Sequence, residues 1–224
     1  HLAAIGRMVS VLAHEVRNPL QAIQMGVDSL NRFSEHRKER TEILEEIHYG
    51  VNLLNQITSE LLDYARPVQL VKTTVYIRDL VAQSLNVISH KLAHVDIRFD
   101  YEREHEFLQV DPLKLTQVLM NLFSNAADAI LEKGTIRIAS RSVAEGGERR
   151  LILSIIDDGC GMSDEDLEQV YEPFFTTKTR GIGLGLPACK KIIEAHGGAI
   201  SIHSKANEGT TAKLLLPLDP RENE

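Results

Sequence analysis

His14, in the stretch LAHEVRNPL, is surrounded by residue types that favour nucleophilic chemistry. A neutral imidazole is nucleophilic near physiological pH, and the adjacent carboxylate of Glu15 can orient it and accept its proton. Asn18 lies one turn further along the same helical face, where its amide could position a water molecule. Leu12 and Val16 lie about 200° around the helix from His14, so His14 is expected to point into solvent. The alternative is a surface histidine in a charged helix.

A second set of polar residues lies in QVLMNLFSNAADAI. At helical spacing, Asn121, Asn125 and Asp128 form a polar stripe beside an apolar one. Asparagine is a poor helix former, and its side-chain oxygen suits a hard cation such as Mg²⁺ that also binds phosphate oxygens. The alternative is a helix that only packs against a sheet.

The stretch LILSIIDDGCGMS runs from an apolar strand directly into a turn with two glycines. Gly159 and Gly161 allow positive φ angles and a close approach to a flat ligand. Asp157, at the end of the strand, can accept a hydrogen bond from an exocyclic amino group, which adenine offers and guanine does not offer at that edge. A plain hairpin turn is the alternative.

The third stretch, EPFFTTKTRGIGLGLPACKKIIEAHGG, brings a glycine-rich loop to the start of a helix. Gly181, Gly183 and Gly185 would offer backbone amides and the positive end of the helix dipole to phosphates. Lys178 and Arg180 add two cations to this predicted lid. The spacing fits neither a P-loop nor a dinucleotide-binding fingerprint. A purely structural glycine loop is the alternative.

Two kinds of hydrophobic pattern divide the chain into two domains. Residues 1–66 show two helical series of apolar residues around a charged loop, which predicts an antiparallel helical hairpin. One hairpin cannot cover both apolar stripes, so we expect a homodimer with a four-helix bundle, the alternative being a monomeric hairpin packed on the rest of the chain. Residues 67–72 are the expected linker and hinge, since Arg66-Pro67 ends the second helix.

Residues 73–220 mix seven short strand-like runs with three helical stretches, near 78–90, 112–131 and 185–196. This pattern predicts an α/β sandwich with one mostly antiparallel sheet covered by helices on one face. The predicted fold class is therefore α+β overall.

The composition excludes some classes of function. The formal net charge of −7 argues against a nucleic-acid partner. No apolar run reaches the roughly 18–20 residues that cross a bilayer, so we expect a cytoplasmic catalytic portion, with any membrane contact through upstream segments. Cys160 and Cys189 show no metal-ligand or C-x-x-C spacing, as expected in a reducing compartment.

Together these stretches resemble the bacterial sensor histidine kinases over nearly the whole chain. LAHEVRNPL is similar to the family's H box, QVLMNLFSNAADAI to the N box, DDGCGM to the G1 box, EPFFTT to the F box and GIGLGL to the G2 box, all in family order. The short lid and the sequence EPFFTTK are most similar to those of the nitrogen-regulation branch of the family. Two residues depart from the family pattern: Asp158 stands where asparagine or threonine is frequent, and Cys160 replaces a frequent proline. Neither change removes an expected ligand.

The resemblance implies a dimerisation and phosphotransfer hairpin followed by an ATP-binding domain of the Bergerat type. It implies His14 as the phosphoacceptor, Glu15 as the acid/base group and Asn18 as a residue supporting phosphatase activity. ATP is the implied substrate, with Asn125 as the Mg²⁺ ligand and Asp157 as the adenine-binding carboxylate. The remaining nucleotide contacts implied are Asn121, Asp128, Gly159, Gly161, Lys178, Arg180, Gly181, Gly183, Gly185 and Leu186.

The expected activity is autophosphorylation of His14 and transfer of the phosphoryl group to an aspartate in the receiver domain of a response regulator. One rival is a Bergerat-type ATPase without histidine transfer, which would lack the helix carrying His14, Glu15 and Asn18. Another is a non-enzymatic scaffold dimer, which would have lost Asn125, Asp157 and the lid glycines.

Overall fold

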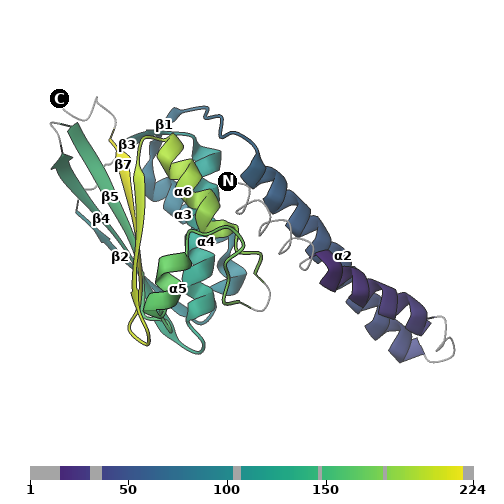
Figure 1. Ribbon diagram of the computed structural model, residues 1–224. Helices are drawn as coiled ribbons and strands as arrows, with labels where there is room; N and C mark the ends of the chain where they lie inside the picture. The colour runs from purple at the N-terminus through teal and green to yellow at the C-terminus, as the bar shows by residue number, and fades with distance from the viewer. Residues whose placement is uncertain (1–15, 31–36, 103–106, 146–147, 179–180, 219–224) are drawn as a thin grey trace. The chain divides into compact units, whose positions relative to one another are not determined.

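The computed structural model describes residues 16–30, 37–102, 107–145, 148–178 and 181–218 (Figure 1). The chain divides into two compact units, His1–Arg66 with Glu172–Leu184 and Pro67–Tyr171 with Gly185–Glu224. Within the described part of the chain, no helix combines the length and the apolar character that a membrane crossing needs.

The first unit contains the predicted helical hairpin. Residues 16–30 are helical, and α2 spans Arg37–Ala65. The two helices run antiparallel and approach closely at glycines, because a Cβ on Gly26 would lie 2.6 Å from Ile47 and one on Gly50 would lie 2.8 Å from Ile23. Small residues at these two points let the helix backbones come together.

A second apolar stripe of the hairpin is left exposed by the described part of the chain. Its five members are between 42% and 49% exposed: Leu20, Val27, Leu44, Val51 and Leu62. Apolar side chains at this exposure along both helices are typical of a surface that another protein surface covers.

The second unit is a sandwich of sheet and helices. Its main sheet has the strand order β2-β4-β5-β7-β6, in which β2 and β4 are parallel and every other pair is antiparallel. The elements are β1 (Thr73–Tyr76), α3 (Ile77–Val87), η1 (Ser89–Lys91), β2 (Val95–Tyr101), β3 (Phe107–Val110), α4 (Pro112–Ala129), β4 (Gly134–Glu145), β5 (Glu148–Asp157), α5 (Asp164–Gln169), α6 (Gly185–Ala195), β6 (Ala199–Lys205) and β7 (Gly209–Pro217).

Two details differ from the sequence-based prediction. The expectation of a single sheet is wrong, because β1 and β3 form a separate two-stranded antiparallel sheet. Each of these four-residue strands leads almost directly into a helix, which leaves them to pair with each other. The short helix α5 was not predicted, although Ser163 caps it by accepting a hydrogen bond from the N–H of Asp166 at 3.1 Å.

The core lies between the main sheet and the helices α3, α4 and α6, which cover one of its faces (Figure 1). On the central strand β5, Leu151, Leu153 and Ile155 are at most 2% exposed, whereas the alternate Ile152 and Ile156 face outward and are partly exposed. The predicted apolar stripe of α4 is buried at four of its five positions: Leu115, Leu119, Leu122 and Ala126.

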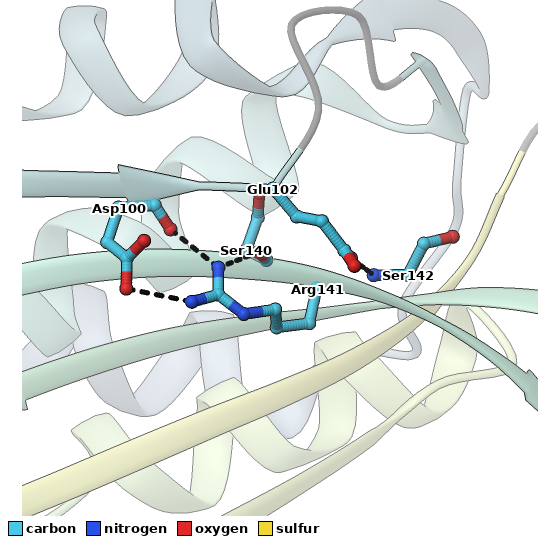
Figure 2. Close-up of polar contacts among 5 residues, drawn as sticks. All are labelled: Asp100, Glu102, Ser140, Arg141 and Ser142. Carbon is cyan, nitrogen blue, oxygen red and sulfur yellow. Dashed lines mark hydrogen bonds and ion pairs between the residues drawn. The ribbon is translucent and has the colours of Figure 1, made fainter.

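Polar contacts reinforce the one parallel strand pair of the sheet (Figure 2). The guanidinium of Arg141 on β4 binds the carboxylate of Asp100 on β2 at 2.8 Å and the carbonyl oxygen of Asp100 at 3.0 Å. Beside it, the carboxylate of Glu102 accepts a hydrogen bond from the N–H of Ser142 at 2.7 Å. These contacts hold the edge strand β2 in register with β4.

Replacement of Leu153 by alanine is expected to lower the free energy of unfolding by about 2–5 kcal/mol, because it opens a cavity in the core. The outward-facing neighbour provides the control, and Ile152→Ala should cost clearly less. Chemical denaturation followed by circular dichroism measures both. Equal losses for the two variants would contradict the assignment of the inner face of β5.

Candidate nucleotide site

Helix α4 holds the two asparagines on one face. Asp111 caps the helix, and Pro112 occupies its first turn. Asn121 and Asn125 are four residues apart, so they lie one turn apart on the same face. Nδ2 of Asn125 donates a hydrogen bond to Oδ1 of Asn121 at 3.0 Å. This bond orients the amide of Asn125, so that its Oδ1 is the atom that could approach a cation.

The start of α6 lies directly against this pair. A Cβ on Gly185 would lie 2.3 Å from Nδ2 of Asn121, so only glycine allows this approach. The first backbone amides of the helix, including that of Leu186, therefore open beside the asparagine face of α4. Amides at a helix N-terminus, beside side-chain oxygens that suit a cation, form a site that can hold a metal-bound phosphate chain.

Asp157, at the end of β5, is a buried carboxylate that is 7% exposed. Its Oδ1 accepts hydrogen bonds from the N–H groups of Gly159 at 3.0 Å and Thr210 at 3.2 Å. Burial raises the pKa of Asp157, and the nearby charge of Asp158 raises it further by a smaller amount. These two effects outweigh the hydrogen bonds from the backbone amides, which lower the pKa. A buried carboxylate of this kind binds strongly to a ligand that supplies a further donor.

The double-glycine turn connects Asp157 to the end of α4. The N–H of Cys160 donates to the carbonyl oxygen of Ala129 at 3.0 Å, and Gly159 packs directly on Ala129. Gly161 has a φ of 63°, and a Cβ there would lie 2.0 Å from the carbonyl oxygen of Lys205. The turn is thus fixed between α4 and the β6–β7 hairpin. The predicted positive φ is found at Gly161, whereas Gly159 does not adopt it and instead allows the close contact with Ala129.

Asp128 lies on the predicted polar stripe of α4 but has a partner of its own. Nζ of Lys91 binds the carboxylate of Asp128 at 3.1 Å and donates to the hydroxyl of Ser124 at 2.8 Å. The contact ties η1 to α4 on the flank of the asparagine pair.

The lid residues belong largely to the first unit. Gly183 has a φ of 72°, and its carbonyl oxygen accepts a hydrogen bond from the N–H of Phe174 at 3.0 Å. Phe174 is buried and Phe175 is half-buried, so the loop is anchored at its start by the side chain of Phe174. Lys178 and Gly181 lie in the loop between Phe175 and Gly183, where the N–H of Gly181 donates to the carbonyl oxygen of Lys178 at 3.4 Å. Arg180 lies outside the described residues.

The predicted phosphoacceptor helix is described only in part. His14 and Glu15 lie outside the described residues, whereas Asn18 is exposed on the helix of residues 16–30. Among the predicted site residues, the second unit brings together Asn121, Asn125, Asp157, Gly159, Gly161, Gly185 and Leu186.

Sequence reasoning missed one residue of this site, Thr210, and two buried residues at the far end of its helices. The backbone amide of Thr210 binds Asp157, and no sequence signal identifies a backbone donor that lies 53 positions away. Asp111 and His196 form a buried pair at the other end of α4 and α6. The step from Asp111 to Pro112 at the start of an apolar helical series is a capping signature that could have identified Asp111.

Residues 110–220 match the family model of the histidine kinase-, DNA gyrase B-, and HSP90-like ATPases, and residues 4–69 match the His Kinase A (phospho-acceptor) domain. The sensor histidine kinase ZraS of Salmonella typhimurium is 35% identical over 100% of this chain, and the signal transduction histidine-protein kinase AtoS of Escherichia coli is 34% identical over the same share. These matches cover 48% and 36% of the two relatives, so the chain spans about half the length of ZraS.

Solved structures give the same result. The catalytic domain of histidine kinase ThkA is 31% identical with a TM-score of 0.59, over 68% of this chain and 99% of that one. Histidine kinase ThkA in complex with response regulator protein TrrA matches 99% of this chain and 64% of that one, with a TM-score of 0.80 and 27% identity. With both family models matched in order and a histidine kinase catalytic domain covered almost completely, the chain belongs to the bacterial sensor histidine kinases.

Proposed function

We propose that the chain uses ATP to phosphorylate His14 and then transfers the phosphoryl group to an aspartate in the receiver domain of a response regulator. The observation that carries this proposal is the buried Asp157, joined through the glycine turn to the helix of Asn121 and Asn125. His14 falls within the matched phospho-acceptor region, residues 4–69. A solved relative in complex with a response regulator supports the partner.

Each residue of the site has a proposed role in binding ATP. Asp157 accepts a hydrogen bond from the exocyclic amino group of adenine, and the turn of Gly159 and Gly161 lets the ring approach the backbone. The N-terminal amides of α6, from Gly185 onward, bind phosphate oxygens. Asn125 supplies a ligand to Mg²⁺, which would neutralise charge on the phosphates during transfer.

The lid residues and Asn121 complete the proposed binding set. Asn121 orients Asn125 through their mutual hydrogen bond. Lys178 and Arg180 are the cations proposed to bind phosphate oxygens, and Gly181 and Gly183 let the loop backbone approach them. Asp128 is proposed to hold Lys91 near the same helix face.

The transfer itself is proposed to depend on positioning. A ring nitrogen of His14 attacks the γ-phosphorus, the bond to the ADP oxygen breaks, and Glu15 accepts the proton that the imidazole loses. In the second step the carboxylate of the receiver aspartate attacks the same phosphorus, and the P–N bond breaks. The exposed Asn18 is proposed to position a water molecule for removal of the phosphoryl group from the regulator.

The domain arrangement and assembly are also proposals. Residues 1–66 would dimerise and present His14, residues 67–72 would act as linker and hinge, and residues 73–220 would bind ATP. The exposed apolar stripe along both helices of the hairpin supports a homodimer with a four-helix bundle. Membership of the nitrogen-regulation branch stays a prediction.

The two rival functions are less well supported. An ATPase without histidine transfer does not account for the phospho-acceptor region matched over residues 4–69. A scaffold without catalysis would be expected to lose Asn125, Asp157 and the lid glycines, and the chain keeps all of them.

Replacement of His14 by glutamine is expected to abolish labelling of the protein by γ-labelled ATP. The label on the unaltered protein should be acid-labile and alkali-stable, as a phosphorus–nitrogen bond requires. His48, exposed on α2, provides the matched control, and His48→Gln should label normally. Label that persists in His14→Gln would remove His14 from its role.

Replacement of Asn125 by alanine is expected to weaken the affinity for MgATP by about tenfold or more, because it removes a metal ligand. The affinity for ATP in EDTA should change little. Titration calorimetry measures both, with Gln117→Ala, one turn before Asn121, as control. Equal losses with and without the metal would contradict a metal-binding role.

Replacement of Asp157 by asparagine is expected to weaken ATP binding by about tenfold or more while raising the thermal midpoint of unfolding. The raised pKa means that the ionised form costs stability, a cost that appears above pH 3.8 and is complete above the raised pKa. ATP binding needs the ionised form, so affinity should fall as pH drops toward that pKa.

Asp158→Asn is the matched control for this pH dependence, because Asp158 is an exposed neighbour whose bond to the N–H of Thr135 an asparagine can also make. It should keep the affinity at neutral pH and shift the loss of affinity only slightly toward lower pH, because the charge of Asp158 makes a smaller contribution to the raised pKa of Asp157. An Asp157→Asn variant that binds ATP normally would exclude Asp157 as the adenine ligand.

A further inference from the structure

A buried polar cluster lies at the junction of the linker and the ATP-binding unit, away from the nucleotide site. Asp111 is 6% exposed and His196 is 1% exposed. The peptide N–H of Asp111 points to Nε2 of His196 at 2.9 Å, and Nδ1 of His196 lies 2.8 Å from the carbonyl oxygen of Ile192. Because a carbonyl oxygen only accepts, Nδ1 carries the proton and Nε2 is the acceptor. Both ring nitrogens of a neutral imidazole are thereby satisfied.

The two carboxylate oxygens of Asp111 hold two different segments. Oδ1 accepts the N–H of Lys114 at 3.0 Å and caps α4. Oδ2 accepts the N–H of Val71, in the linker, at 2.8 Å. The side chain of Val71 is 75% exposed, so its backbone amide and not its side chain fastens this part of the linker.

This cluster connects the linker to both helices of the nucleotide site. Helices α4 and α6 run antiparallel, with Asn121 against Gly185 at one end and Asp111 against His196 at the other. The ten residues from Asp111 to Asn121 correspond to about 15 Å along α4. The linker is thus attached at the ends of α4 and α6 that lie away from Asn121 and Gly185, where the proposed phosphate-binding groups are.

We propose that Asp111 and His196 are positioning residues for phosphoryl transfer, which fasten the linker at Val71. The swing between the two units is then confined to the start of the proposed hinge of residues 67–72, around Arg66 and Pro67. Val68 supports this position of the pivot, because it packs against the core of the ATP-binding unit. A shorter flexible segment keeps the bound γ-phosphate at a higher effective concentration near His14. The inference rests on the proposed kinase function.

The variant Asp111→Ser tests the fastening. Serine still caps α4, but its single short side chain cannot also reach the amide of Val71. Hydrogen exchange at the Val71 amide should accelerate by about tenfold or more, as expected when a charge-assisted hydrogen bond is lost. The affinity for MgATP should stay within about twofold, whereas the rate of His14 phosphorylation at saturating ATP should fall by about tenfold.

Leu113→Ser is the matched control, because Leu113 is 81% exposed in the first turn of the same helix. It should preserve the exchange rate at Val71, the affinity and the transfer rate. This control separates the loss of the linker contact from a general effect of serine in the first turn of α4.

A pair of variants at His196 tests the second partner. His196→Gln still offers a carbonyl oxygen to the N–H of Asp111, so this variant should keep part of the transfer rate of the unaltered protein. His196→Leu offers no acceptor and should transfer about tenfold more slowly at unchanged ATP affinity. A merely structural role for His196 would lower the thermal midpoint without this split between rate and affinity.

Two outcomes would overturn the proposal in distinguishable ways. If Asp111→Ser exchanges rapidly at Val71 but phosphorylates His14 at the normal rate, the fastening exists and does not position the transfer. If the unaltered protein binds ATP but never labels His14, the kinase function itself fails, and the positioning role fails with it.

Discussion

The proposed nucleotide site depends on keeping the carboxylate of Asp157 out of water at the end of a central strand. The backbone closes around it because two glycines permit contacts that a side chain would block. Gly209 has a φ of 88°, and a Cβ there would lie 2.0 Å from the carbonyl oxygen of Asp157, while Gly159 lies against the last residue of α4. In the proposed function, a donor supplied by the bound ligand would offset part of the energetic cost of burying this charge.

The proposed binding residues are divided between the two structural units. Asn121, Asn125, Asp157 and the start of α6 at Gly185 belong to one unit. Gly183, only two positions before Gly185, belongs to the other. The part of the proposed site that would receive adenine therefore lies within a single unit, whereas the lid glycine Gly183 lies in the other.

Much of this arrangement was predictable because it follows local rules. The change from helical to alternating spacing near residue 72 located the two kinds of structure, and the glycines at 159 and 161 located the turn beside Asp157. Contacts between distant backbone groups were not predictable. The bonds from Val71 to Asp111 and from Asp111 to His196 join positions 40 and 85 residues apart, and backbone donors carry no sequence signature.

The two glycines of the hairpin have a mechanical consequence. Gly26 receives the side chain of Ile47, and Gly50 receives that of Ile23, so the helices interlock at two levels. Axial sliding would move the side chain of Ile47 off Gly26 and toward the bulkier side chains one turn away on the same helix face, such as Ile23. A piston-like shift of one helix against the other is thereby resisted, and a stimulus that reaches the hairpin would pass through it as a rotation or bend of both helices together.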